Sequence, residues 1–213
     1  MLFAGQFNYR RRGGADARAL FPGAPVVAYV NTSAEVKAAA DICSMSSNAA
    51  AIVAAQDSEA DTMPPDKYLA RAVPNRRVVW WDGACIVHEQ VTAAKLRDFR
   101  QFHPGTRIIA HPECPPDVVA EGDFSGSASG IIDYVGREQS ASALLVTECS
   151  MPSNIADAHP QVEFVGPSIK MITLEKILWW IHSMTTEIEV PAHLAHVTRA
   201  AVQRMVDLSP KPR

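Results

Sequence analysis

The sequence predicts an α/β protein of two repeated three-layer α/β/α units, each with a short parallel sheet. Two observations lead to this fold class. Short apolar runs alternate along the chain with segments of helical pattern, as in parallel sheets that are covered by helices. In addition, residues 31–48 align without a gap on residues 113–130, 82 positions further on. A repeat of this length covers a supersecondary unit, so we expect two related units.

The repeat is marked by identical residues and by its surroundings. Each copy follows an apolar run, 26–30 or 107–110, and ends in a serine-rich loop before a helical segment. We therefore expect the equivalent loops of the two units to face a common site. The identical pairs are Val36 and Val118, Ala38 and Ala120, Asp41 and Asp123, and Ser47 and Ser129.

Short runs of apolar or β-branched residues have the composition of buried parallel strands. They are bounded by Gly, Pro, Asp or polar residues, which are typical of strand ends. The predicted strands are Val26–Val30, Ala51–Ala55, Val78–Trp81, Arg107–Ala110, Ala143–Val146 and Val162–Val165.

Helical segments are predicted between these strands and near the C-terminus. Residues 91–102, for example, carry charges along one side and apolar residues along the other, which suits an amphipathic helix on a sheet. The predicted helices are Ala34–Ala40, Pro65–Ala72, Val91–Phe102, Pro116–Glu121, Gly130–Val135, Leu174–Ser183 and Leu194–Leu208.

These elements predict how the chain is organised. We expect a divergent, disordered start over residues 1–18, one α/β unit over residues 19–103 and a second over residues 104–190. A helix and a disordered tail, Ser209–Arg213, are expected to complete the chain over residues 191–213.

The composition is that of a globular protein and argues against several classes of function. The net charge of −3 argues against a general nucleic-acid or membrane-surface binder. No apolar run reaches the ~18 residues that cross a bilayer. The four cysteines form no CxxC pair, which argues against a zinc finger. Because the sequence shows no secretion signal, we expect reduced thiols and a cytoplasmic protein.

Polar residues end two of the predicted strands at equivalent places. His111 and Glu113 follow the strand 107–110, and Tyr29 and Asn31 occupy the matching end of the strand 26–30. Ligands in α/β sheets bind at the carboxyl ends of strands. Residues two apart on an extended segment point to the same side, so His111 and Glu113 are suited to acid–base work on one small substrate. A surface turn made by the neighbouring prolines is the alternative.

The serine-rich loops 44–47 and 125–130 lie before helical segments. Hydroxyls and amides at the start of a helix favour carboxylate or phosphate oxygens, whereas plain N-capping needs no ligand. The sequence leaves both interpretations of these loops open.

Cys85 follows the predicted strand 78–81 in the segment Gly83-Ala-Cys-Ile-Val-His88. A cysteine at this place is a nucleophile, a metal ligand or a packing residue. His88 is suited to pair with Cys85 only if the turn folds back.

A series of motifs runs through the chain. They are Tyr29-Val-Asn-Thr-Ser-Ala-Glu-Val-Lys37, Ser46-Ser-Asn48, Pro65-Asp-Lys-Tyr-Leu69, Gly83-Ala-Cys-Ile-Val-His88, His111-Pro-Glu-Cys-Pro-Pro116, Asp123-Phe-Ser-Gly-Ser127, Thr147-Glu-Cys-Ser-Met151 and Ile172-Thr-Leu-Glu-Lys-Ile177. In this order they resemble the quinolinate synthase family, over about residues 19–208.

The resemblance implies a fold, a reaction and a cofactor. The family's fold is three pseudo-symmetric α/β/α units around a central [4Fe–4S] cluster, so the two units here are implied to be a fragment of it. The family condenses iminoaspartate with dihydroxyacetone phosphate to give quinolinate, in NAD biosynthesis. Each unit supplies one cysteine to the cluster, and the fourth iron acts on substrate as a Lewis acid.

The resemblance also implies roles for particular residues. Cys85 resembles the cluster ligand of the family's second unit. His111 and Glu113 are implied to be catalytic, because they resemble groups that move protons during condensation and dehydration. The residues that resemble substrate-binding groups are Tyr29, Asn31, Ser46, His111 and Glu113.

The sequence departs from the family at several places. Most of the first unit has no counterpart before residue 19, and residues 162–173 carry no cysteine where many members have the third cluster ligand. Where the family's third unit has a threonine, this sequence has Ala128. One cysteine ligand of three does not hold a [4Fe–4S] cluster in the normal way. The other cysteines, at positions that are not ligands in the family, are Cys43, Cys114 and Cys149.

These departures leave alternative functions open. The chain is an active quinolinate synthase, an inactive remnant that binds small dicarboxylates or phosphates, or an interaction subunit whose site another chain completes. We also expect exposed unit faces to cause self-association. A monodisperse monomer in solution scattering would count against that expectation.

Overall fold

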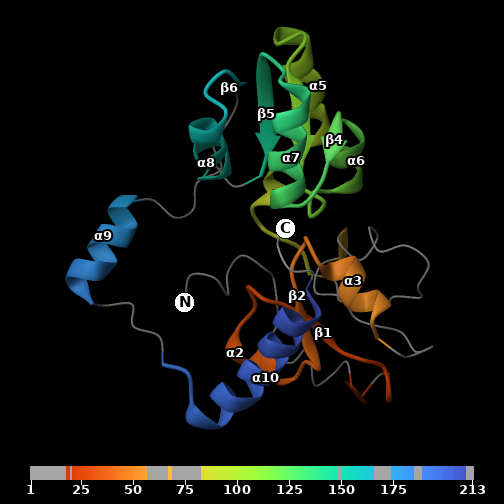
Figure 1. Ribbon diagram of the computed structural model, residues 1–213, viewed down its shortest axis with the longest axis vertical. Helices are drawn as coiled ribbons and strands as arrows, with labels where there is room; N and C mark the ends of the chain where they lie inside the picture. Colours follow the sequence, from red (N-terminus) through yellow and green to blue (C-terminus); the bar gives the residue numbers. More distant parts are fainter. Residues whose placement is uncertain are drawn as a thin grey trace. The chain divides into compact units, whose positions relative to one another are not determined.

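The computed structural model describes residues 18–19, 21–56, 67–68, 83–147, 150–165, 174–184 and 189–209. Contacts divide the chain into two compact units, which are coloured along the sequence in Figure 1. The terminal unit comprises residues 2–86 with 190–213, and the central unit comprises residues 87–189. Each unit is mixed α/β with a short parallel sheet, as the sequence predicts.

The terminal unit is built on two parallel strands, β1 (Val27–Tyr29) and β2 (Ile42–Ser44), which pair with Val27 opposite Ile42. One face packs through Val26 and Ala28 against Val36 of α2 (Ala34–Ala38). Ser33 begins α2, because its side chain accepts a hydrogen bond from the Val36 backbone N–H at 3.5 Å.

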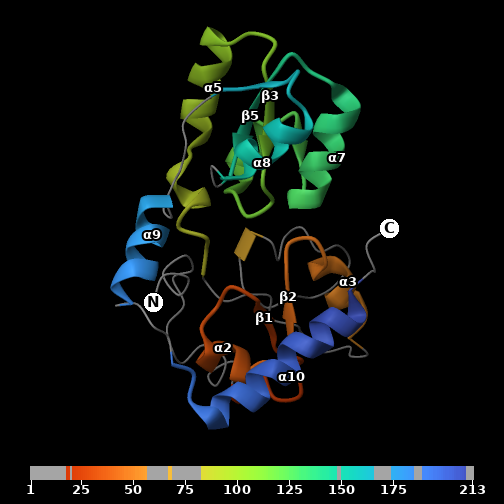
Figure 2. The same cartoon turned by 60° about the vertical axis from the view of Figure 1, so that its left-hand side comes forward.

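The other face of this sheet is covered by α3 (Ala49–Ala54) and α10 (Ala192–Leu208). Ile52, Ala201 and Met205 pack there with Val27 and Cys43. Polar contacts also fasten α10 to the unit, since the Thr198 hydroxyl donates to the Ala34 carbonyl at 3.0 Å. The last helix therefore completes the fold of the first strands, and both views show it beside them (Figures 1 and 2).

The central unit has four parallel strands in the order β4-β3-β5-β6. The strands are β3 (Arg107–Ala110), β4 (Phe124–Ser125), β5 (Ser142–Val146) and β6 (Glu163–Phe164). The helices are the 3-10 helix η1 (His88–Gln90), α5 (Ala93–Phe102), α6 (Pro116–Ala120), α7 (Ala128–Glu138), α8 (Ser150–Ala158) and α9 (Leu174–Ser183).

Alternation along β3 gives the central unit two hydrophobic cores. Ile108 packs with Leu96 of α5 and Val118 of α6, whereas Ile109 packs on the other face with Ile131 of α7. Figure 2 shows α5 and α7 on opposite sides of the sheet. Ile108 and Ile109 are at most 1% exposed, so each contributes about 1.5–3 kcal/mol through burial. The predicted three-layer arrangement is confirmed in this unit.

The sequence repeat has a physical basis in two equivalent aspartates. The Asp41 carboxylate accepts from the Val26 N–H at 2.8 Å, and 82 positions later the Asp123 carboxylate accepts from the Ile108 N–H at 2.8 Å. The backbone N–H of each aspartate donates in return to the carbonyl of the same partner. Each aspartate thus ties the start of one strand to the start of its neighbour.

The Ala51–Ala55 strand prediction is wrong, because residues 49–54 form α3. A short apolar run has no periodicity that separates strand from helix, and its alanines have high helix propensity. The strand next to α3 is β2, which was not predicted, and β4 and α8 were not predicted either. The Val78–Trp81 strand, most of the Pro65–Ala72 helix and residues 1–17 lie outside the described residues.

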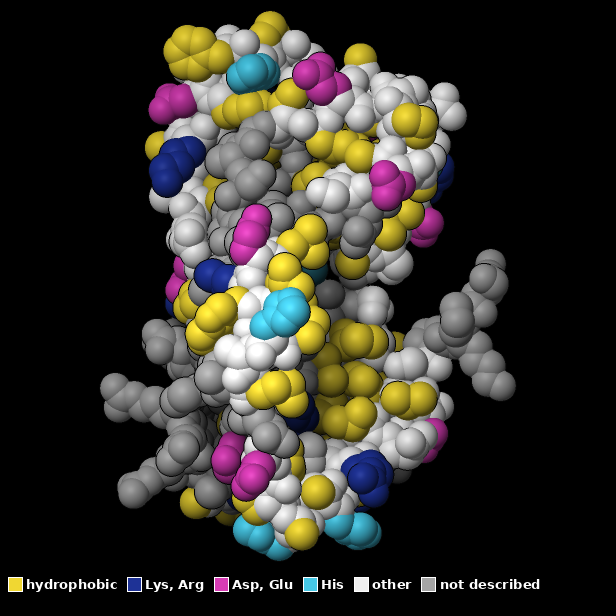
Figure 3. Space-filling model, turned by 90° about the vertical axis from the view of Figure 1, so that its left-hand side faces the viewer, with side chains coloured by type: hydrophobic (Ala, Val, Ile, Leu, Met, Phe, Trp, Pro, Cys, Tyr) yellow, Lys and Arg dark blue, Asp and Glu magenta, His cyan; other side chains and the backbone are white. Residues whose placement is uncertain are grey.

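Helix α9 presents an apolar surface, which Figure 3 shows in yellow. Leu174, Leu178, Trp179 and Ile181 are each more than half exposed within the described part of the chain. Self-association through exposed faces stays a prediction. None of the helices in the described residues has the length and hydropathy to span a bilayer.

Replacing Asp123 by alanine is expected to lower the free energy of unfolding by about 2 kcal/mol. The Ile108 N–H loses its acceptor, and Arg100 loses a carboxylate at 3.3 Å. Urea unfolding measures the effect. Asp98→Ala, at an exposed position of α5, is the matched control and is expected to change stability by less than about 0.5 kcal/mol. Equal effects of the two substitutions would contradict the role assigned to Asp123.

Candidate functional site

Four buried polar residues gather where strands of the central unit end. His111 follows β3, Glu113 lies two residues later, Thr147 follows β5, and His88 begins η1. Their exposed fractions are between 2% and 7%. We call these four residues the His88 cluster. Burial of so many polar groups is uncommon without a structural or functional reason.

His88 lies at the centre of the cluster. Its Nε2 is 3.1 Å from the Thr147 hydroxyl, and its Nδ1 is 3.5 Å from Oε2 of Glu113. The ring stacks on that of His111, with centroids 4.7 Å apart and planes 7° from parallel. The imidazole is therefore held on two edges and one face.

His111 is held as a neutral ring. Burial lowers its pKa to about 4, which the Glu113 charge opposes and the nearby His88 reinforces. The Glu113 backbone N–H donates to Nδ1 of His111 at 3.4 Å, so the ring proton lies on Nε2. His111 is thus an N–H donor through Nε2 at neutral pH.

The turn after β3 fixes these side chains through backbone bonds. The His111 N–H donates to the Val146 carbonyl at 3.3 Å, and the Cys114 N–H donates to the His111 carbonyl at 2.9 Å. The Cys114 thiol also donates to the Val146 carbonyl at 3.4 Å. The adjacent prolines restrict the backbone further. The predicted surface turn is therefore a buried turn that carries polar side chains inward.

Cys85 lies three residues before His88, on the continuously described segment 83–90. Cys85 is buried, with 5% of its surface exposed, and it belongs to the terminal unit, whereas His88 and Glu113 belong to the central unit.

The residues predicted in the terminal unit lie at the carboxyl ends of its strands. Tyr29 is the buried last residue of β1, Asn31 is exposed just beyond it, and half-buried Ser46 follows β2. No serine caps α3, although its preceding loop is serine-rich. In the central unit, Ser127 does cap α7, by accepting from the Gly130 N–H at 3.4 Å. Plain N-capping therefore accounts for the second serine-rich loop only.

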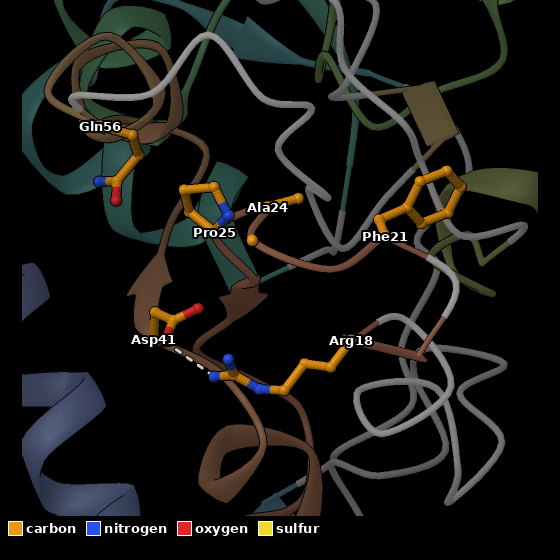
Figure 4. Close-up of a pocket in the computed structure, with 7 residues that line it drawn as sticks. Arg18, Phe21, Ala24, Pro25, Asp41 and Gln56 are labelled. Atoms are coloured by element: carbon orange, nitrogen blue, oxygen red, sulfur yellow. Dashed lines mark hydrogen bonds and ion pairs between the residues drawn. The ribbon is translucent and has the colours of Figure 1, made fainter.

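A cavity of about 350 Å³ lies at the opposite, amino end of β1 and β2 (Figure 4). Arg18 and Asp41 line it and form an ion pair at 2.8 Å, which neutralises both charges. Phe21, Pro25 and Gln56 complete much of the wall. None of the predicted site residues borders this cavity, and ligands of α/β sheets bind at the other end of the strands.

Comparison with known proteins matches residues 9–207 to the NadA family, the quinolinate synthetase A proteins. The chain belongs to this family. It is 48% identical over 206 residues to a quinolinate synthase of Sinorhizobium medicae, covering 92% of this chain and 57% of that protein. It is 46% identical over 199 residues to a quinolinate synthase of Agrobacterium fabrum, covering 90% and 58%. A quinolinate synthase of Caulobacter vibrioides is 41% identical over 212 residues, covering 92% and 58%.

The chain thus spans less than two thirds of the length of these quinolinate synthases. Its described cysteines do not fit a [4Fe–4S] cluster held by three thiolates. Burial raises the pKa of the Cys43 thiol to about 11. The Cys114 S–H donates a hydrogen bond to the Val146 backbone carbonyl. Cys149 lies outside the described residues.

Two members of the His88 cluster were not predicted to be site residues. The sequence assigns His88 only a conditional pairing with Cys85 and does not single out Thr147. The signal for Thr147 was present, because it follows a predicted strand just as His111 does. The position of His88 depends on how residues 83–90 fold back, which no local pattern predicts.

The stability of the chain is expected to fall below neutral pH through His111. Its pKa is about 4 in the folded state and near 6.5 when unfolded, so the unfolded chain binds more protons between these values. The stabilisation is complete above about pH 6.5 and decreases towards pH 4, by roughly 3 kcal/mol at most. Urea unfolding between pH 4.5 and about 7, with a chelator present, measures this slope.

His111→Gln is expected to flatten the pH dependence of unfolding, because glutamine does not titrate. The exposed His103 provides the matched variant His103→Gln, which is expected to keep the wild-type slope. A His111→Gln chain that loses stability as steeply as the wild type would contradict the assignment.

Proposed function

We propose that the chain contributes the substrate-binding and proton-transfer groups of a quinolinate synthase, and that its two units correspond to the second and third units of that family. The proposal is carried by the buried His111 and Glu113 at the carboxyl end of β3, in a chain of this family. The substrates are iminoaspartate and dihydroxyacetone phosphate, which are small polyanions. Joining them into quinolinate releases phosphate and two waters, so protons must be moved repeatedly.

In this proposal, Glu113 takes a proton from a substrate carbon or from an attacking group. Glu113 is only 2% exposed, so its carboxylate is shielded from bulk water. His111 donates a hydrogen bond from Nε2 to a substrate oxygen, which stabilises negative charge without becoming charged itself. Glu113 is thus the proton acceptor, and His111 polarises a substrate oxygen.

Tyr29, Asn31 and Ser46 are proposed to bind substrate from the terminal unit. Their positions at the carboxyl ends of β1 and β2 support this role. Ser46 is half-buried and lies in the loop between β2 and α3. Three described cysteines are thiols rather than disulfides, which supports the further proposal of a cytoplasmic location.

A second candidate function is the binding of small dicarboxylates or phosphates without turnover. The sequence favours it, because residues 162–173 carry no cysteine where many family members have the third cluster ligand. In the family's reaction the cluster acts as the Lewis acid.

Titration calorimetry with quinolinate tests the binding groups directly. The wild-type chain is expected to bind, and His111→Gln and Glu113→Gln are each expected to change the affinity by at least about tenfold. Both changes alter one hydrogen-bonding group in a buried site. His103→Gln, at an exposed position, is expected to bind as the wild type does.

Turnover separates the two candidate functions. Quinolinate formed from iminoaspartate and dihydroxyacetone phosphate under anaerobic conditions would support the synthase, whereas binding without product would support the second candidate. Equal affinities of wild type, His111→Gln and Glu113→Gln for quinolinate would refute the proposed site.

A further inference from the structure

We propose that His88 is a positioning residue, which holds the Glu113 carboxylate and the His111 ring in the orientation that proton transfer requires. This role rests on the proposed function and deepens it, because it adds a residue that contacts both of the proposed catalytic groups. The three side chains and Thr147 all belong to the central unit, so their arrangement is internal to one compact unit.

The Glu113 carboxylate selects the His88 nitrogen that carries a proton. Nδ1 lies 3.5 Å from Oε2, and the two side chains are 7% and 3% exposed. A lone pair on Nδ1 would face a negative charge with little water between them, whereas an N–H at that place is attracted to it. Nδ1 therefore carries a proton and faces the carboxylate. The separation is longer than an ordinary N–H···O bond, as is common for catalytic groups before substrate binds.

Thr147 holds the opposite edge of the imidazole. Its hydroxyl lies 3.1 Å from Nε2, directly after the end of β5. A hydroxyl both donates and accepts hydrogen bonds, so it fits Nε2 in either charge state of the ring. Turning the ring over would break the contact with Glu113 and the contact with Thr147 together. The His88 imidazole therefore has one preferred orientation.

The fixed His88 ring in turn restricts His111. The two rings are stacked, with centroids 4.7 Å apart and planes 7° from parallel. Rotation of the His111 ring would give up this stacking and the hydrogen bond that its Nδ1 accepts from the Glu113 backbone N–H at 3.4 Å. The Nε2–H of His111, which is proposed to polarise a substrate oxygen, thus points in one direction. Donors that are oriented beforehand stabilise developing charge without reorganisation.

The backbone places His88 where it can brace both strand ends. His88 begins η1, and its carbonyl accepts from the Val91 N–H at 3.4 Å. His111 and Thr147 follow strands that are neighbours in the sheet. A histidine that only filled the core would make no selective contact with the two groups that are proposed to act on substrate.

Two substitutions separate the contacts of His88, because an asparagine amide nitrogen reaches the place of Nδ1 and a glutamine amide reaches that of Nε2. His88→Asn keeps a donor beside Glu113, whereas His88→Gln keeps only the contact with Thr147. His88→Gln is therefore expected to bind quinolinate at least about fivefold more weakly than His88→Asn. Titration calorimetry measures both affinities. The exposed His103→Gln is the control and is expected to bind as the wild type does.

Ring-nitrogen NMR of the ligand-free chain, with isotope-labelled histidine, gives a second readout that does not depend on quinolinate. In the wild type, His88 is expected to carry a proton on Nδ1, and His111 to carry its proton on Nε2 alone. His88→Phe keeps a flat ring against His111 and is expected to preserve this single tautomer of His111. His88→Ala is expected to give a mixture of His111 tautomers. Circular dichroism checks that each variant is folded.

The outcomes separate the positioning role from the proposed function. A folded His88→Gln chain that binds quinolinate as tightly as His88→Asn, or a wild-type His88 without a proton on Nδ1, would overturn the positioning role alone. A wild-type chain that does not bind quinolinate would refute the proposed function, and the ring-nitrogen spectrum would still test where the His88 proton lies.

Discussion

The hydrogen bond from a strand N–H to an aspartate carboxylate is the interaction on which each sheet depends. Asp123 accepts from Ile108 at the start of β3 and also forms ion pairs with Arg100 and Arg107. It therefore fixes β3 against β4 and α5 at once. The register of β3 then determines where His111 and Glu113 emerge at the other end. Asp41 has the same role in the smaller sheet.

Packing explains why the functional residues are so well buried. The apolar side chains of β3 and β5 alternate between two cores, which leaves only the strand ends for polar groups. His111 and Thr147 follow the two central strands, next to each other in the sheet. His88 fills the space between them, and its two nitrogens contact groups from both strand ends.

Much of this arrangement could be predicted from the sequence, and the failures have physical causes. The strand Arg107–Ala110 and the helix Leu174–Ser183 were predicted with their observed bounds, because Gly, Pro and polar residues mark their ends. The run Ala51–Ala55 was misassigned, since alanines fit either structure and only the packing of Ile52 decides. Neither the packing of α10 on β2 nor the position of His88 follows from local patterns, because both depend on contacts distant in sequence.

Iron and sulfide reconstitution under anaerobic conditions tests whether the described cysteines of this chain can hold a [4Fe–4S] cluster. Iron and acid-labile sulfide are counted per chain, together with the visible absorbance. We expect no bound sulfide and no cluster absorbance, because the described cysteines do not supply three thiolate ligands. About four irons per chain with equal sulfide would contradict this expectation.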